Sequence, residues 1–148
     1  MNLRRAMMEG DLEAVVALQQ AAYARNRTIL GVEPIPLKAD YRDILATMEV
    51  WLGESDQGLD GVLILEPRQD DLLIWSIATE PQRQQRGLGR DLLTFAEHRA
   101  RMLGLATMRL YTGTRLVHLV EWYARHGYRT ERIEEMADRS VTHMAKQL

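Results

Sequence analysis

The sequence predicts an α/β (α+β) fold in which a mixed, mostly antiparallel central sheet is flanked by helices on both faces. Two observations favour this fold. Apolar, strand-like segments separated by short polar turns follow one another over residues 50–79, and amphipathic helical segments alternate with strand-like ones over residues 88–146. Strands joined by tight turns pair antiparallel, and helices inserted between strands cover the faces of a sheet.

The first part of the chain is predicted to hold a short strand and two helices. The strand is expected over residues 2–6, and a helix with Asp11 as its N-cap follows, because apolar residues recur there at helical spacing. Residues 24–38 contain two prolines. Proline lacks a backbone donor and disrupts a helix interior, so no continuous helix is expected in this stretch. A second helix is predicted over residues 41–48.

A three-stranded antiparallel meander is predicted next. Its strands are Val50–Gly53, Gly61–Leu65 and the strongly apolar Leu72–Thr79. The turns between them, Ser55–Gly58 and Pro67–Asp70, are rich in residues that favour tight turns.

Two more helices and three more strands complete the predicted fold. An apolar stripe begins at Leu88 and continues at helical spacing to Gly104, a residue type favoured just after a helix end. The remaining elements are a strand over 108–112, a helix over 115–125, and strands over 128–134 and 139–146.

Composition places the chain among globular proteins with one domain. We expect residues 1–148 to form a single domain, since this length is large enough for one core and small for two. The chain has no cysteine, which excludes disulfides, cysteine thiolate nucleophiles and cysteine metal sites. No apolar run approaches the roughly 18 residues that span a bilayer, and the first ten residues hold no apolar signal core. We therefore predict a cytoplasmic protein without a membrane partner.

The charge pattern argues for a small anionic ligand. The net charge of −2 is unlike that of a dedicated nucleic-acid binder, so no nucleic-acid partner is predicted. The chain nevertheless has 17 arginines against two lysines, and five of these arginines fall between Arg83 and Arg101 beside only two acidic residues. Such a zone attracts anions, although a solvated helix face has the same composition. The four histidines lack metal-ligand spacing, so no metal is predicted.

The most informative segment is the glycine-containing turn over residues 81–90, between an apolar strand and an amphipathic helix. Free backbone N–H groups at a helix start bind phosphates, glycine permits close approach, and arginine pairs with phosphate oxygens. A P-loop requires Lys followed by Ser or Thr after its last glycine, but Arg90 and Asp91 stand there. A dinucleotide fingerprint requires a third glycine where Leu92 stands.

The turn resembles a different motif. Gln84–x–x–Gly87–x–Gly89 is similar to the Gln/Arg–x–x–Gly–x–Gly/Ala motif of the GCN5-related N-acetyltransferase (GNAT) family. The preceding Ile77–Pro81 resembles the strand end of that family, and Glu121–Tyr128 resembles its later Tyr–x–x–x–Gly–Phe/Tyr element. A plain strand–turn–helix junction and a nucleotide-binding module remain alternative interpretations of the turn.

The resemblance implies an N-acetyltransferase that moves an acetyl group from acetyl-CoA to a primary amine of a small molecule or protein. A non-catalytic CoA-binding regulatory or sensor module of the same fold is the alternative, because the family's usual asparagine before the tyrosine is missing. A monomer or a homodimer is expected. The implied cosubstrate-binding residues are Ile77, Ala78 and Thr79 for the pantetheine arm, and Gln84, Gln85, Arg86, Gly87, Leu88, Gly89 and Arg90 for the pyrophosphate.

The resemblance also assigns one catalytic residue. Tyr123 matches the family's tyrosine acid, and packing on an amphipathic helix is its alternative role. No carboxylate occurs in the strand before the turn, so the general base stays open among Glu33, Glu80, His118, Glu121 and water. The residues implied to face the acceptor are Glu33, Trp75 and Ser76.

Overall fold

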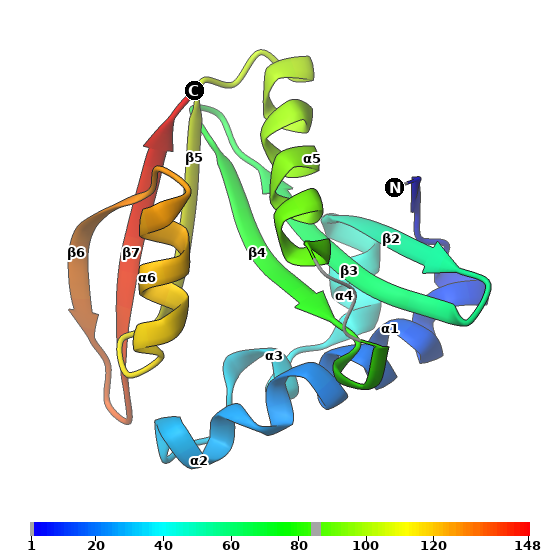
Figure 1. Cartoon of the computed structure of the whole chain (residues 1–148), viewed down its shortest axis with the longest axis horizontal. Helices are drawn as coiled ribbons and strands as arrows, with labels where there is room; N and C mark the ends of the chain where they lie inside the picture. Colours follow the sequence, from blue (N-terminus) through cyan, green and yellow to red (C-terminus); the bar gives the residue numbers. More distant parts are fainter. Residues whose placement is uncertain (1, 84–86) are drawn as a thin grey trace.

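The computed structural model describes residues 2–83 and 87–148, so the predicted pyrophosphate-binding residues Gln84, Gln85 and Arg86 lie outside the described residues. In the described part, seven strands form one sheet in the order β1-β2-β3-β4-β5-β7-β6. Every neighbouring pair is antiparallel except β4 and β5 (Figure 1). The strands are β1 (Leu3–Arg5), β2 (Glu49–Ser55), β3 (Gly58–Pro67), β4 (Leu72–Thr79), β5 (Thr107–Gly113), β6 (Arg129–Glu135) and β7 (Ser140–Gln147).

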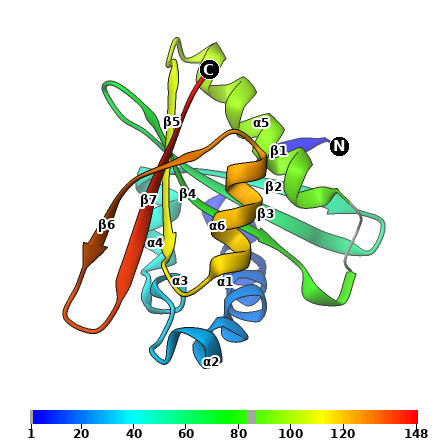
Figure 2. The same ribbon diagram turned by 60° about the vertical axis from the view of Figure 1, so that its left-hand side comes forward.

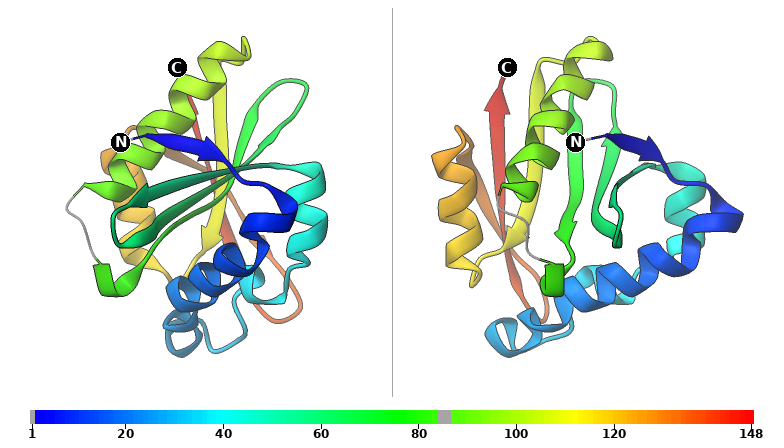
Figure 3. Two further views of the ribbon diagram at one scale, coloured as in Figure 1. Left: turned by 90° about the vertical axis from the view of Figure 1, so that its right-hand side faces the viewer. Right: turned by 45° about the vertical axis from the view of Figure 1, so that its right-hand side comes forward.

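Helices cover both faces of this sheet, as Figure 3 shows for α1 and α5. One face packs its buried residues, among them Val62 and Ile64, against α1 (Met8–Ala24) and α4 (Tyr41–Thr47). The opposite face packs Leu63 and Leu65 against α5 (Leu88–Met102) and α6 (Val117–Arg125). Alternate residues of β3 thus point to opposite layers, and the predicted fold class is confirmed.

The proline-containing stretch holds two short helices, α2 (Asn26–Leu30) and α3 (Ile35–Lys38). The first ends at Gly31, whose φ of 74° is left-handed, and Pro34 precedes the second. No continuous helix forms across the prolines, as predicted. In the described part of the chain no helix is both long and apolar enough to cross a membrane.

The start of α1 differs from the prediction. The helix begins at Met8, four residues earlier than expected, and Asp11 lies within its first turn rather than at the N-cap. The Asp11 carboxylate accepts a hydrogen bond from the Met7 backbone N–H (2.7 Å) and two from the Arg4 guanidinium (2.8 and 2.9 Å). The ion pair to β1 buries Asp11 and fixes the helix start, a tertiary effect that local spacing does not reveal.

The sheet separates between β4 and β5. These two strands pair only over Leu72–Ile74 and Met108–Leu110. Ile74 is opposite Leu65 and Ser76 is opposite Ile64, so Trp75 is an extra residue that forms a β-bulge in β4. Beyond the bulge, Ser76–Thr79 pair with β3 alone among the described strands, whereas β5 continues along β7 to Gly113. Figure 1 shows the two strands diverging, which leaves one edge of β4 unpaired.

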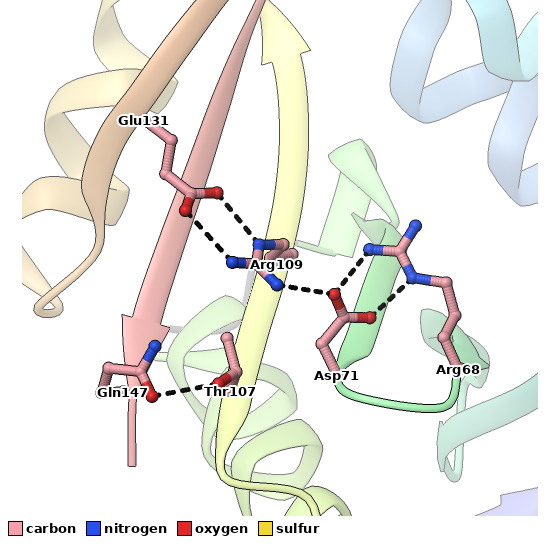
Figure 4. A network of polar contacts seen from close by, with 6 residues as sticks. All are labelled: Arg68, Asp71, Thr107, Arg109, Glu131 and Gln147. Carbon is pink, nitrogen blue, oxygen red and sulfur yellow. Dashed lines mark hydrogen bonds and ion pairs between the residues drawn. The ribbon is translucent and has the colours of Figure 1, made fainter.

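An ion-pair network holds the closed end of this separation (Figure 4). The buried Asp71 immediately precedes β4 and accepts hydrogen bonds from Arg68 (2.6 and 2.9 Å) and from Arg109 of β5 (2.9 Å). Arg109 also donates to Glu131 of β6 at 3.0 and 3.2 Å. Hydrogen bonds from Arg68 first, and from Arg109, lower the pKa of Asp71 although burial opposes the shift. The network thus joins the start of β4 to β5 in the region where, among the described residues, these two strands are paired.

We predict that Asp71→Asn lowers the free energy of unfolding by about 1–3 kcal/mol, because it leaves two neighbouring guanidiniums without their shared anion. The figure is kept small because both arginines are partly exposed and screened by solvent. Urea unfolding of the variant and the wild type measures the difference. Asp70→Asn, at an exposed neighbour without a recorded ion pair, is the matched control and should change little.

The difference in the free energy of unfolding between Asp71→Asn and the wild type should depend on pH. Since the folded-state pKa of Asp71 is lowered, its stabilisation is complete above about pH 4, the ordinary range for an unfolded Asp, and is lost as pH falls through the lowered value. A difference between Asp71→Asn and wild type that persists unchanged at pH 2 would contradict this account.

Candidate active site

A cavity of about 590 Å³ lies where β4 and β5 diverge. Its walls come from α1, α2, α3, β4, the start of α5, β5, α6 and the segment leading into β7. All predicted site residues within the described part line it except Glu33: Trp75, Ser76, Ile77, Ala78, Thr79, Gly87, Leu88, Gly89, Arg90 and Tyr123.

The start of α5 forms one end of the cavity. Gly87 is the N-cap with a left-handed φ of 81°, which glycine adopts without strain. A Cβ on Gly89 would lie 3.6 Å from the Trp122 ring, so the space above this residue is already narrow. The Arg90 guanidinium folds back over Gly87, 3.0 Å from where a Cβ would stand. The first backbone N–H groups of a helix lack intrahelical acceptors, and together with Arg90 they suit an anionic phosphate.

The unpaired edge of β4 forms a second wall. Ile77 and Thr79 pair with Leu63 and Gly61 of β3 on one side only. The Tyr23 hydroxyl donates a 3.4 Å hydrogen bond to the Ile77 carbonyl, so this backbone group is reached from outside the sheet. An extended ligand with amide groups can hydrogen-bond to such an edge as an added strand does.

Tyr123 of α6 lines the cavity. Its residue exposure is 8%, and the ring packs edge-on against Trp122 and Tyr128. Within the described residues, no hydrogen bond of the Tyr123 hydroxyl is recorded. Every side-chain polar atom of these residues that is inaccessible to solvent has a hydrogen-bond partner. The hydroxyl therefore opens onto the cavity, which packing alone does not require. The pKa of Tyr123 is raised, mainly by burial and also by the nearby Tyr23, so the hydroxyl is protonated at neutral pH.

A buried polar network supports the wall and was not predicted. The fully buried Gln19 amide donates to the Tyr41 hydroxyl (3.0 Å) and to the Ser76 hydroxyl (3.1 Å). The Tyr23 and Ser76 hydroxyls are 2.7 Å apart. Burial raises the pKa of Tyr41 to about 12 and also raises that of Tyr23, which keeps both hydroxyls neutral. Ser76 is thus engaged by α1, and Tyr23 carries this network to the cavity surface.

The structure does not bring Glu33 into the cavity. Its carboxylate accepts hydrogen bonds from the Arg27 guanidinium in an exposed position, and this pairing lowers the pKa of Glu33. Glu80 and Glu121 also lie outside the lining, whereas His118 is part of it. Among the described residues no Asp or Glu lines the cavity, and no group of three or more His, Asp or Glu is placed to hold a metal ion.

The separated sheet brings together a helix start suited to anions, an unpaired strand edge and a buried tyrosine. This combination suits an acyl thioester whose carrier bears phosphate groups. The acetyltransferase (GNAT) domain family matches this chain over residues 46–130, which is more than half of it. The chain belongs to this family. The predicted family is therefore confirmed, and the predicted enzyme class agrees with it.

Individual relatives agree with this membership. The uncharacterized N-acetyltransferase YvbK of Bacillus subtilis (strain 168) is 29% identical over 84 residues, which are 57% of this chain and 53% of that protein. The chain thus spans about half the length of this curated relative.

Solved structures share the fold over 99% of this chain. The PaiA N-acetyltransferase of Thermoplasma acidophilum, in complex with coenzyme A, superposes with a TM-score of 0.79 at 16% identity and 98% coverage of its own chain. A GNAT family acetyltransferase of Elizabethkingia anophelis with acetyl-CoA bound gives a TM-score of 0.78 at 15% identity and 97% coverage. These likenesses confirm the fold class independently of the sequence motifs.

We predict that Gly89→Asp weakens acetyl-CoA binding by at least roughly tenfold, because a carboxylate at the first turn of α5 repels phosphate oxygens and occupies their approach. Calorimetric titration with acetyl-CoA measures the change. Gly10→Asp is the matched control, since a Cβ there meets nothing within 4 Å. Unchanged affinity in a folded Gly89→Asp protein would remove this turn from the binding site.

Proposed function

We propose that this chain is an N-acetyltransferase that transfers the acetyl group of acetyl-CoA to a primary amine of a small molecule or protein. The observation that carries the proposal is the presence, in one cavity, of the unpaired β4 edge, the start of α5 and the Tyr123 hydroxyl. Membership of the GNAT family supports it.

The donor would lie along the start of α5 and the edge of β4. Backbone N–H groups of Gly87, Leu88, Gly89 and Arg90 bind the pyrophosphate in this proposal, together with the predicted Gln84, Gln85 and Arg86. The pantetheine arm pairs with Ile77, Ala78 and Thr79. In this proposal the thioester lies beside Tyr123, which is supported by the shared lining of the strand edge and the Tyr123 side chain.

The reaction follows from these positions. The neutral amine attacks the thioester carbonyl, a C–N bond forms, and the C–S bond breaks. A backbone N–H of β4 stabilises the oxyanion, and the Tyr123 hydroxyl donates a hydrogen bond and then a proton to the departing sulfur. Its raised pKa makes Tyr123 a weak acid, which suffices because a thiolate is a good leaving group. In this proposal the proton of the amine passes to water, since no Asp or Glu among the described residues lines the cavity, and water then returns a proton to Tyr123.

Three sequence predictions belong to this proposal. Residues 1–148 form one acyl-CoA-binding domain, which the single sheet running from β1 to β7 supports. The protein acts in the cytoplasm as a monomer or homodimer. Neither a nucleic acid nor a membrane is its partner.

We predict that Tyr123→Phe lowers kcat by roughly 10²–10⁴-fold and leaves acetyl-CoA affinity within about twofold, because the ring stays and only the proton donor is lost. Thiol release gives kcat and calorimetry gives affinity. Tyr128→Phe is the matched control, since its hydroxyl donates to Glu97 at 2.9 Å outside the lining. A variant with full turnover would exclude the acid role, and a wild type that binds acetyl-CoA without any turnover would favour the regulatory alternative.

The pH profile of turnover should rise without a later fall. Thiol release increases as the acceptor amine loses its proton, and the raised pKa keeps Tyr123 protonated beyond about pH 10, the ordinary pKa of tyrosine. Rates measured to pH 10 are corrected with an enzyme-free reaction, since acetyl-CoA hydrolyses in alkali. A descending limb below pH 10 that disappears in Tyr123→Phe would contradict the expected shift.

A further inference from the structure

The cavity has a second end, away from the start of α5. Leu30 of α2 packs so closely on Gly113 of β5 that a Cβ there would lie 2.6 Å from the leucine Cδ2. Gly113 pairs with Val141, and the Thr114 N–H donates to the Ser140 carbonyl at 3.0 Å. The end of β5 and the start of β7 therefore lie beside α2, an arrangement visible in Figures 1 and 2. The other end is marked by Gly89 and Trp122, so the two ends are built from different elements.

Asn26 faces this second end without a partner. It is 93% buried, with 7% of its surface exposed, and it lines the cavity. No hydrogen bond of its side-chain amide is recorded within the described residues. Because no polar side-chain atom there is both sealed and unpaired, the amide opens onto the cavity. An amide that faces a cavity and has no recorded protein partner there can offer its N–H donors and its carbonyl acceptor to a ligand.

Arg139 contributes a buried charge at the same end. Its side chain is 8% exposed and lines the cavity. Nε and Nη2 donate to the carboxylate of Asp138 at 3.1 Å each, whereas Nη1 has no recorded partner in the described part. Asp138 itself is half exposed, with 51% of its side chain accessible. One donor of a buried guanidinium thus remains available for an anionic group.

Among the described residues, the formally charged side chains that line the cavity are all positive. They are Arg25, Arg90, Arg125 and Arg139, with His118 as a further basic side chain. Arg90 stands on the first turn of α5, and Arg125 lies one turn along α6 from Trp122, which packs on Gly89. Both serve the phosphate end. Arg25, which precedes Asn26 and has no recorded ion pair, and Arg139 belong to the second end.

We infer that the acceptor is a small amine that also carries a carboxylate, and that Arg139 and Asn26 bind this carboxylate. The inference rests on the proposed function. A cationic amine alone would be repelled by Arg25 and weakly by Arg139, whose charge Asp138 partly neutralises, and no carboxylate of the described residues lines the cavity to attract it. Guanidinium and amide N–H donors match the two oxygens of a carboxylate. The acceptor is small because the 590 Å³ cavity also holds the acetylated end of the donor.

The test compares amino acids with their own carboxamides. The full chain with acetyl-CoA is assayed for thiol release on the common L-amino acids, on the matching L-amino acid amides, and on the amines that lack the carboxyl carbon altogether. At least one acid is expected to show a kcat/KM roughly ten- to hundredfold above that of its amide, the range for a hydrogen bond to a charged group. The comparison is stringent, because the amide has the less basic amine and therefore more of the reactive neutral form.

Two variants locate the effect. Arg139→Gln should bring the acid-to-amide ratio close to one and leave the KM for acetyl-CoA unchanged. Arg132→Gln is the matched control, since this exposed arginine of β6 does not line the cavity. Asn26→Asp preserves shape and adds a negative charge, so it should lower the ratio even if Arg139→Gln fails to fold. Acetyl-CoA affinity reports folding in each case.

Each remaining outcome overturns the inference in a distinguishable way. Amides or simple amines that are acetylated as well as the acids by wild type would refute the carboxylate and leave the N-acetyltransferase intact. A preference for acids that survives in both folded variants would place the carboxylate elsewhere. Absence of thiol release in all three series, with acetyl-CoA still bound, would overturn the inference, whereas the proposed function would fall only if protein amines and other small amines also gave no release.

Discussion

The short parallel pairing between β4 and β5 is the constraint on which the site depends. It covers three residues of each strand, and Asp71 clamps it through Arg109 at the closed end. The bulge at Trp75 begins where this pairing stops and turns the rest of β4 away. If the pairing of β4 with β5 continued, the backbone groups of Ile77–Thr79 would hydrogen-bond to β5 and the cavity would close. The ion pairs around Asp71 therefore lie outside the cavity and yet determine its shape.

The two ends of the cavity present different hydrogen-bonding groups because different elements of the fold build them. The start of α5 presents backbone N–H groups beside a glycine that leaves room for a phosphate, which is a property of helix geometry. The opposite end presents side-chain donors from α2 and from the start of β7, which is a property of particular residues. The Tyr23 and Tyr123 side chains also line the cavity, and Tyr23 contributes to the raised pKa of Tyr123. Under the proposed function, the end of the cavity at α5 binds the acyl donor and the end at α2 binds the acceptor.

The elements and the glycine-containing turn before α5 could be predicted from the sequence because both are encoded locally. Apolar spacing located every strand within a few residues, and Gly87 and Gly89 marked the turn. The acceptor end could not be predicted, since its contacts join distant segments. Gln19 and Ser76 are 57 positions apart, and only packing reveals that they share a hydrogen bond. The sequence predicts that Glu33 faces the acceptor, because it is a carboxylate in the loop expected to wall the acceptor pocket. In the structure its carboxylate instead pairs with Arg27, six positions away, outside the cavity. Asn26 and Arg139 could not be distinguished in sequence from ordinary surface residues.

The positive lining also bears on the general base, which sequence left open. An amine bound beside Arg25 and Arg139 is destabilised in its protonated form, because like charges lower the pKa of an ammonium group. A carboxylate on the same molecule is attracted by those arginines and supplies the binding free energy that the amine lacks. The cavity can thus favour the neutral, nucleophilic amine without a carboxylate base of its own, and water suffices to accept the proton. On this account the absence of Asp and Glu from the described lining and the preference for an anionic acceptor have one electrostatic cause.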